Sequence, residues 1–82
     1  MTTTSLPRLT ADQREAVGRF ALAHAQVAIR QQKVAEAKAA LSGATGSRLA
    51  SALAWLDLQR TILEQVQGDL DEAEAAIVEA IR

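Results

Sequence analysis

Apolar residues recur at every seventh position through the second half of the chain: Leu49, Leu56, Leu63, Leu70 and Ile77. A sevenfold repeat of this length is typical of an amphipathic helix that packs lengthwise against another helix. Further apolar residues are expected to widen the same face, namely Leu53, Trp55, Ile62, Val66, Ala73 and Ile81. The pattern therefore predicts a long helix over residues 48–81 that needs a partner.

The first half of the chain carries the same repeat and supplies such a partner. Its sevenfold series is Phe20, Val27, Val34 and Leu41, and we expect Val17, Ala21, Ala28 and Ala35 to flank it. Thr10 precedes Gln13 by three residues, which is the capping-box pattern of a helix N-terminus. We predict a helix over residues 11–41.

Residues 42–47 separate the two periodic segments and contain two glycines and three hydroxyl residues, a composition typical of a loop. Gly43 is expected to take a left-handed conformation that ends the first helix, and Thr45 or Ser47 to cap the second. So short a loop predicts an antiparallel helical hairpin. In that hairpin, residues whose numbers sum to about 89 face each other, so that Val34 lies beside Trp55 and Leu56.

The predicted organisation is an all-α protein with one hairpin domain over residues 10–82. Residues 1–9 contain Pro7 and show no periodicity, so we expect a flexible N-terminal arm. Gly68 could interrupt the second helix, but the sevenfold spacing continues through it and favours one continuous helix. Gly18 would lie at nearly the same level, which suggests a close approach of the two backbones there.

A hairpin of 82 residues is too small to bury much apolar surface, and its apolar residues are mostly alanine, with one Phe and one Trp. We therefore expect the chain to form a homo-oligomer, most simply a dimer that makes a four-helix bundle. The expected interface residues are Phe20, Val27, Val34, Leu53, Trp55, Ile62, Val66, Ile77 and Ile81.

The charged residues indicate no nucleic-acid or membrane partner, because the formal net charge is only −1 and no segment is apolar enough to span a bilayer. The antiparallel hairpin would place the acidic cluster of residues 69–79 beside Arg8, Arg14 and Arg19. Such exposed pairs bias register and orientation more than they stabilise.

No residue pattern predicts an enzyme. The chain has no cysteine, and its single histidine, His24, has no metal-ligand or catalytic partner near it in sequence, so we expect a semi-buried or interface histidine. The acidic residues of the second helix lack the histidine that di-iron helical bundles require. We expect no metal, cofactor or small-molecule ligand.

These observations favour a structural or interaction protein that acts by self-association through its apolar helix faces. The alternative is a small adaptor or co-chaperone that binds a partner helix along Trp55, Ile62 and Val66. A cytoplasmic location is the default expectation.

The end of the chain carries a resemblance to a known family. Glu74-Ala75-Ala76-Ile77-Val78, followed by Ile81 and a terminal Arg82, resembles the ending of the needle subunits of type III secretion systems, and Arg60 stands at a similar distance from the loop. The resemblance covers residues 42–82 and implies a secreted helical hairpin that polymerises into a hollow filament. In the loop, Gly43 and Gly46 replace the prolines usual in that family.

Overall fold

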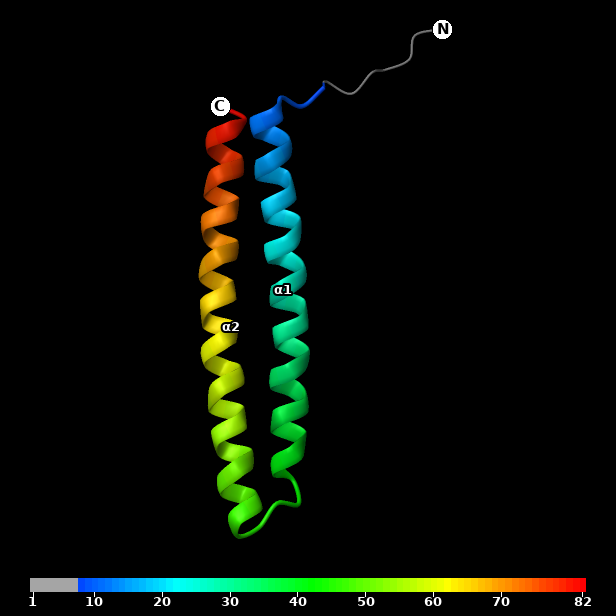
Figure 1. Ribbon diagram of the computed structural model, residues 1–82, viewed down its shortest axis with the longest axis vertical. Helices are drawn as coiled ribbons and strands as arrows, with labels where there is room; N and C mark the ends of the chain where they lie inside the picture. The colour runs from blue at the N-terminus through cyan, green and yellow to red at the C-terminus, as the bar shows by residue number, and fades with distance from the viewer. Residues whose placement is uncertain (1–7) are drawn as a thin grey trace, which may run out of the picture.

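The computed structural model describes residues 8–82 and consists of two long antiparallel helices, α1 (Ala11–Leu41) and α2 (Ser47–Ala80), joined by a short turn (Figure 1). The predicted all-α hairpin is confirmed. The bounds of α1 agree with those expected, and α2 begins and ends one residue earlier than expected. Most of the expected arm over residues 1–9 lies outside the described residues.

The N-terminus of α1 forms the predicted capping box. The Gln13 amide donates to Thr10 Oγ1 at 3.1 Å, and the Thr10 amide donates to Gln13 Oε1 at 2.9 Å. Gln13 also reaches across the hairpin, because its Nε2 donates to the carbonyl of Ala80 at 3.2 Å. One side chain therefore both caps α1 and ties it to the last turn of α2.

The turn uses a different glycine from the one expected. Gly46 has φ 60° and ψ −133°, whereas no other described residue has a positive φ, so the left-handed role predicted for Gly43 was wrong. At the end of α1, the Ser42 amide donates to the carbonyl of Ala39 and the Ala44 amide donates to the carbonyl of Leu41. These hydrogen bonds between residues three apart end the helix without a left-handed residue. Gly46 is also the N-cap of α2 and provides no side-chain cap, so the prediction of a cap by Thr45 or Ser47 was wrong too.

α2 is continuous through Gly68, as predicted. A Cβ atom added at Gly68 or at Gly18 would meet no other atom within 4 Å. The expected close approach of the two backbones at these glycines was therefore wrong. Both glycines lie in open helix surface, where they weaken the helix without making room for a neighbour.

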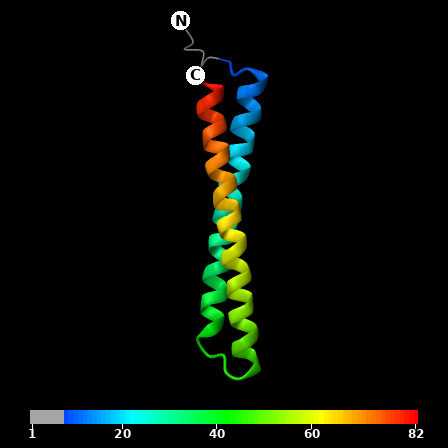
Figure 2. The same cartoon turned by 90° about the vertical axis from the view of Figure 1, so that its left-hand side faces the viewer.

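The contact between the helices follows a strict alternation of three and four residues. The buried and half-buried positions of α1 include Ala16, Phe20, Ala23, Val27, Arg30, Val34, Ala37 and Leu41, and those of α2 include Leu56, Gln59, Leu63, Val66, Leu70, Ala73, Ile77 and Ala80. This is the seam of a two-stranded coiled coil, and Figure 2 shows the two helices crossing as they wrap around each other. The flank expected for α1 was wrong, because Val17, Ala21, Ala28 and Ala35 are exposed.

The core is thin. The buried hydrophobic residues are Ala16, Val27, Val34, Ala37, Leu56 and Ala73. Val34, Ala37 and Leu56 form a cluster against which the partly buried Leu41 and Leu63 pack. The predicted pairing of Val34 with Leu56 is confirmed by this cluster, but Trp55, also expected beside Val34, is exposed and is not part of it. Half of the six buried hydrophobic residues are alanines, so the hairpin by itself buries little side-chain area.

Ion pairs contribute little to holding the helices together. Within residues 8–82 the two ion pairs are Lys33 with Glu36 and Arg82 with Glu79, each at 3.8 Å and each within one helix. The pairing expected between the acidic residues of α2 and the arginines of α1 is therefore not formed as direct contacts. Exposed pairs of this kind contribute about 0 to 1 kcal/mol.

Candidate interaction surface

The expected interface residues divide into two groups in the structure. Val27 and Val34 are buried within the hairpin seam, and Phe20, Ile62, Val66 and Ile77 are half-buried at or beside it. Leu53, Trp55 and Ile81 are exposed. The seam residues are largely used by contact between α1 and α2, whereas the exposed ones are free to contact another molecule.

A shallow hollow identifies one side of the hairpin. It has a volume of about 260 Å³ and is lined from α1 by Arg19, Leu22, Ala23 and Gln26 and from α2 by Asp69 and Ala73. Residues seven apart lie on the same flank of a coiled-coil helix. Ile62 and Trp55 therefore continue the Asp69 flank of α2, and Ile29 continues the Leu22 flank of α1.

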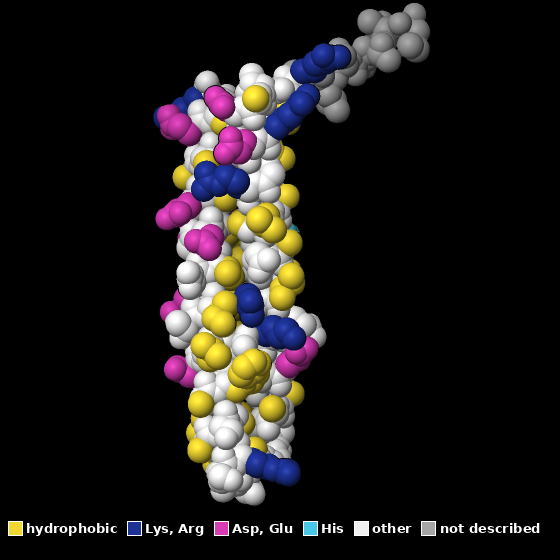
Figure 3. Space-filling model, in the orientation of Figure 1, with side chains coloured by type: hydrophobic (Ala, Val, Ile, Leu, Met, Phe, Trp, Pro, Cys, Tyr) yellow, Lys and Arg dark blue, Asp and Glu magenta, His cyan; other side chains and the backbone are white. Residues whose placement is uncertain are grey.

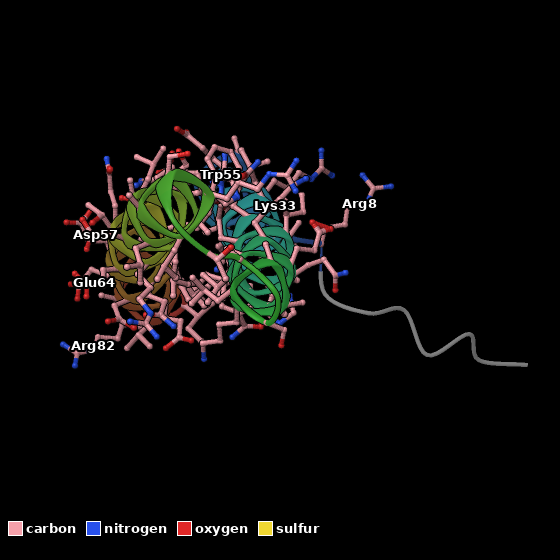
Figure 4. All side chains as sticks on the ribbon, turned by 90° about the horizontal axis from the view of Figure 1, so that it is seen from below. Arg8, Lys33, Trp55, Asp57, Glu64 and Arg82 are labelled. Atoms are coloured by element: carbon pink, nitrogen blue, oxygen red, sulfur yellow. The ribbon has the colours of Figure 1, made fainter. Side chains whose placement is uncertain are left out.

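We call this side of the hairpin the Trp55 face and define it by Leu22, Ile29, Trp55, Leu58 and Ile62. Leu22 is 64% exposed, Trp55 49% and Leu58 48%, and Ile29 is exposed to a similar degree. Figure 4 shows Trp55 and Lys33 projecting from the same side of the hairpin, while Asp57 and Glu64 project from the outer side of α2.

The Trp55 face carries hydrophobic side chains from both helices. Figure 3 shows hydrophobic side chains of both helices spread over the visible side of the hairpin, with Lys and Arg side chains among them near its middle. Single exposed leucines are ordinary on protein surfaces, but several large apolar side chains together on one side mark an interaction site.

A smaller apolar group lies nearer the end that carries the termini. Phe20, Ile77 and Val78 line a second shallow hollow, of about 380 Å³, together with Glu74. Val78 is 50% exposed, and Ile81, close by in sequence, is 62% exposed. This group contains the residues of the needle-like ending, but it has fewer large side chains than the Trp55 face.

One polar layer interrupts the seam near its middle. Gln59 is only 2% exposed, and its Oε1 atom makes no hydrogen bond with the described part of the chain. Arg30 lies at the same level on α1, and its Nε atom is likewise buried and unbonded. A buried polar layer weakens a coiled coil but penalises shifted registers, so this pair favours a single alignment of the two helices.

His24 is exposed rather than semi-buried, and its ring centre lies 6.0 Å from that of Phe20 at a tilt of 36°. Within the hairpin it therefore covers the edge of Phe20 and is otherwise open to solvent. Among residues 8–82 no cluster of three or more potential metal ligands occurs. Over the same residues, neither helix combines the length and the apolar character required to cross a membrane.

Sequence reasoning missed Leu22, Ile29 and Leu58 as surface residues, although a signal for Leu22 and Ile29 was present. Leu22 and Ile29 are seven apart, and so are Trp55 and Ile62, so each helix carries a second sevenfold series beside its seam. Placing Trp55 and Ile62 on the same wide face as the seam residues merged the two series of the second helix. The three-and-four alternation of the seam separates them.

Comparison with known proteins gives no further assignment, since no protein family, no curated protein sequence and no solved structure matches the chain.

Proposed function

We propose that this protein is a non-enzymatic structural or interaction protein that acts by self-association through the exposed apolar side of its helical hairpin. The observation that carries the proposal is the Trp55 face, where Leu22, Ile29, Trp55 and Leu58 are each about half exposed or more. Burying one such side chain contributes about 1.5 to 3 kcal/mol. A second hairpin offers the same apolar residues and would cover them.

The thin core supports the same proposal. Three of the six buried hydrophobic residues are alanines, namely Ala16, Ala37 and Ala73. Within residues 8–82 no large side chain is fully buried. A two-helix protein of this kind gains a second layer of core when two hairpins form a four-helix bundle. Self-association then supplies stability as well as function.

A filament is the second candidate, favoured by the exposed Val78 and Ile81 at the end that carries the termini. If the Trp55 face joins two copies and this second group contacts a different surface on a third, the assembly does not close and a polymer grows. The needle-like ending of the sequence fits this version. It rests on fewer apolar residues than the closed dimer.

Light scattering coupled to size-exclusion chromatography, over a range of protein concentrations, tests self-association directly. We expect an assembly larger than one chain at micromolar concentration. Leu58→Asp should reduce it to a monomer, because a carboxylate in the centre of the apolar contact would lose its hydration. Val78→Asp is the matched control: it is as exposed as Leu58 but lies outside the Trp55 face, and it should leave a dimer intact.

The same two variants separate the candidate functions. Elongated polymers in electron micrographs that disappear in Val78→Asp would favour the filament. Circular dichroism shows whether Leu58→Asp remains helical, and chemical cross-linking of the wild-type chain gives the assembly size independently. A cooperatively folded wild-type monomer at micromolar concentration would overturn self-association and leave the adaptor that binds a partner helix as the better hypothesis.

A further inference from the structure

The two halves of the hairpin carry opposite charge. The half that contains the turn, residues 27–62, has five Lys and Arg residues against two Asp and Glu residues, which gives +3. The half that contains the termini, residues 8–26 and 63–82, has four Arg residues against eight Asp and Glu residues, which gives −4 with His24 neutral. Figure 3 shows most of the acidic side chains of the visible side towards this second end.

We propose that a second copy of this chain packs on the Trp55 face in the antiparallel orientation, with the turn of one hairpin beside the termini of the other. The inference rests on the proposed self-association and adds its geometry. In this orientation the +3 half of each copy lies along the −4 half of its partner. Electrostatic complementarity of this kind fixes orientation more than it adds affinity.

The apolar residues allow this orientation. Trp55, Leu58 and Ile62 lie on the turn side of the middle of α2, while Leu22 lies on the termini side of the middle of α1. A two-fold axis that passes near the level of Ile62 therefore superimposes the apolar centre of one face on that of the other. It also brings Lys33 of one copy to the level of Asp69 of the second copy.

The parallel orientation places equal charges together. The +3 half of each copy would then lie beside the +3 half of the other, and the −4 half beside the −4 half, because a two-fold axis along the hairpin keeps each residue at its own level. Like charges at close range oppose association.

The area available requires the two copies to overlap along most of their length. A hairpin face about 45 Å long and roughly 20 Å wide offers on the order of 900 Å². Stable interfaces bury about 800 Å² on each partner. A staggered arrangement that joins only the ends would bury too little surface for a stable interface. The two antiparallel hairpins must therefore overlap along nearly their full length.

Disulfide trapping in the full chain tests the orientation, since the chain has no cysteine of its own. Ser51→Cys and Glu72→Cys both lie on the exposed stripe that includes Trp55, Leu58 and Ile62, on opposite sides of the proposed axis. Mixed under oxidising conditions, with one variant carrying a mass tag, they should form the mixed disulfide in excess over either homodimer. Ala54→Cys, on the outer side of α2, is the control and should not cross-link.

Each result has a separate meaning. In the antiparallel pair two copies of Ser51→Cys stand about 33 Å apart along the helix, far beyond disulfide reach. Abundant homodimers of Ser51→Cys and of Glu72→Cys would overturn the inference while self-association stands. A dimer by light scattering that forms no mixed disulfide would also overturn it, because the two copies would then be parallel or would meet on another face. A monomer by light scattering would overturn the proposed function itself.

Salt gives a second readout that does not depend on introduced cysteines. Because opposite halves attract in the antiparallel pair, raising NaCl from low to high concentration should raise the dissociation constant by roughly 3- to 30-fold. Lys33→Glu should weaken association at low salt, whereas Lys38→Glu, on the opposite flank of α1, should change it much less. Association that strengthens with salt would show repulsion between like halves and overturn the antiparallel arrangement.

Discussion

At the scale of single residues, Gly46 and Gln59 set the geometry of the hairpin. Gly46 takes φ 60° and ψ −133° at the start of α2, a conformation that an L side chain rarely adopts. Gln59 places a buried carboxamide in a seam whose other named residues, apart from Arg30, are apolar. The first makes the reversal of the chain possible, and the second limits which register the helices choose.

Replacing Gly46 separates backbone strain from side-chain contact. A Cβ atom at Gly46 or at Gly43 would meet nothing within 4 Å, so any difference between them comes from the backbone. We expect Gly46→Ala to lower the free energy of unfolding by about 1 to 3 kcal/mol, the usual range for such strain. Gly43→Ala, the matched control, should change it little. Urea denaturation at one fixed protein concentration measures both, and equal effects would contradict the role assigned to Gly46.

Gln59→Leu should raise the free energy of unfolding by about 1 kcal/mol, because the substitution removes a buried oxygen that lacks a hydrogen bond. Gln67→Leu, at an exposed position of the same helix, is the control for the change in helix propensity. Denaturation of the two variants under identical conditions gives the comparison. A loss of stability in Gln59→Leu alone would mean that Gln59 bonds to Arg30 in solution.

At the scale of the helices, the sevenfold repeat predicted both elements and their antiparallel pairing. Two long periodic segments, with a capping box at one end and a Gly/Ser loop between them, leave few folds other than an antiparallel hairpin. Val34 and Leu56 pack together, as the predicted register required. The flank of α1 was harder to predict, since ten of its 31 residues are alanine and alanines occur all around it. A methyl group does not distinguish a seam position from a surface position.

Alanine at Gly18 or Gly68 should strengthen the helices. Both glycines are exposed within continuous helices and contact nothing that a Cβ would displace. Each substitution should raise the free energy of unfolding by about 0.5 to 1 kcal/mol, and the two should add in the double variant. Thermal and urea denaturation check this. A loss of stability would place another chain against the substituted glycine.

At the scale of the whole molecule, the interaction surface could be predicted only in part. The sequence indicates that two alanine-rich helices leave apolar residues uncovered, and Trp55 was among those expected. Leu22 and Leu58 became evident only when the seam was known, because both lie outside it and are exposed. The charge asymmetry between the halves likewise depends on which residues the hairpin brings to the same level.

Self-association should make thermal stability depend on protein concentration. If the folded dimer unfolds to separate chains, each tenfold increase in concentration should raise the midpoint by about 3 to 5 °C. The single tryptophan offers a second signal. The fluorescence emission of Trp55 should move to shorter wavelength as the dimer forms, because association removes the indole ring from water. A midpoint and an emission spectrum that are both independent of concentration would show a monomer.

The position of the chain ends has a consequence for proteins fused to them. Residue 8 and residue 82 lie at one end of the hairpin and the turn lies at the other (Figure 1). In an antiparallel pair, two proteins fused to these termini would be held at opposite ends of a rod roughly 50 Å long. The pair would then act as a molecular ruler that keeps its two cargoes at a fixed separation.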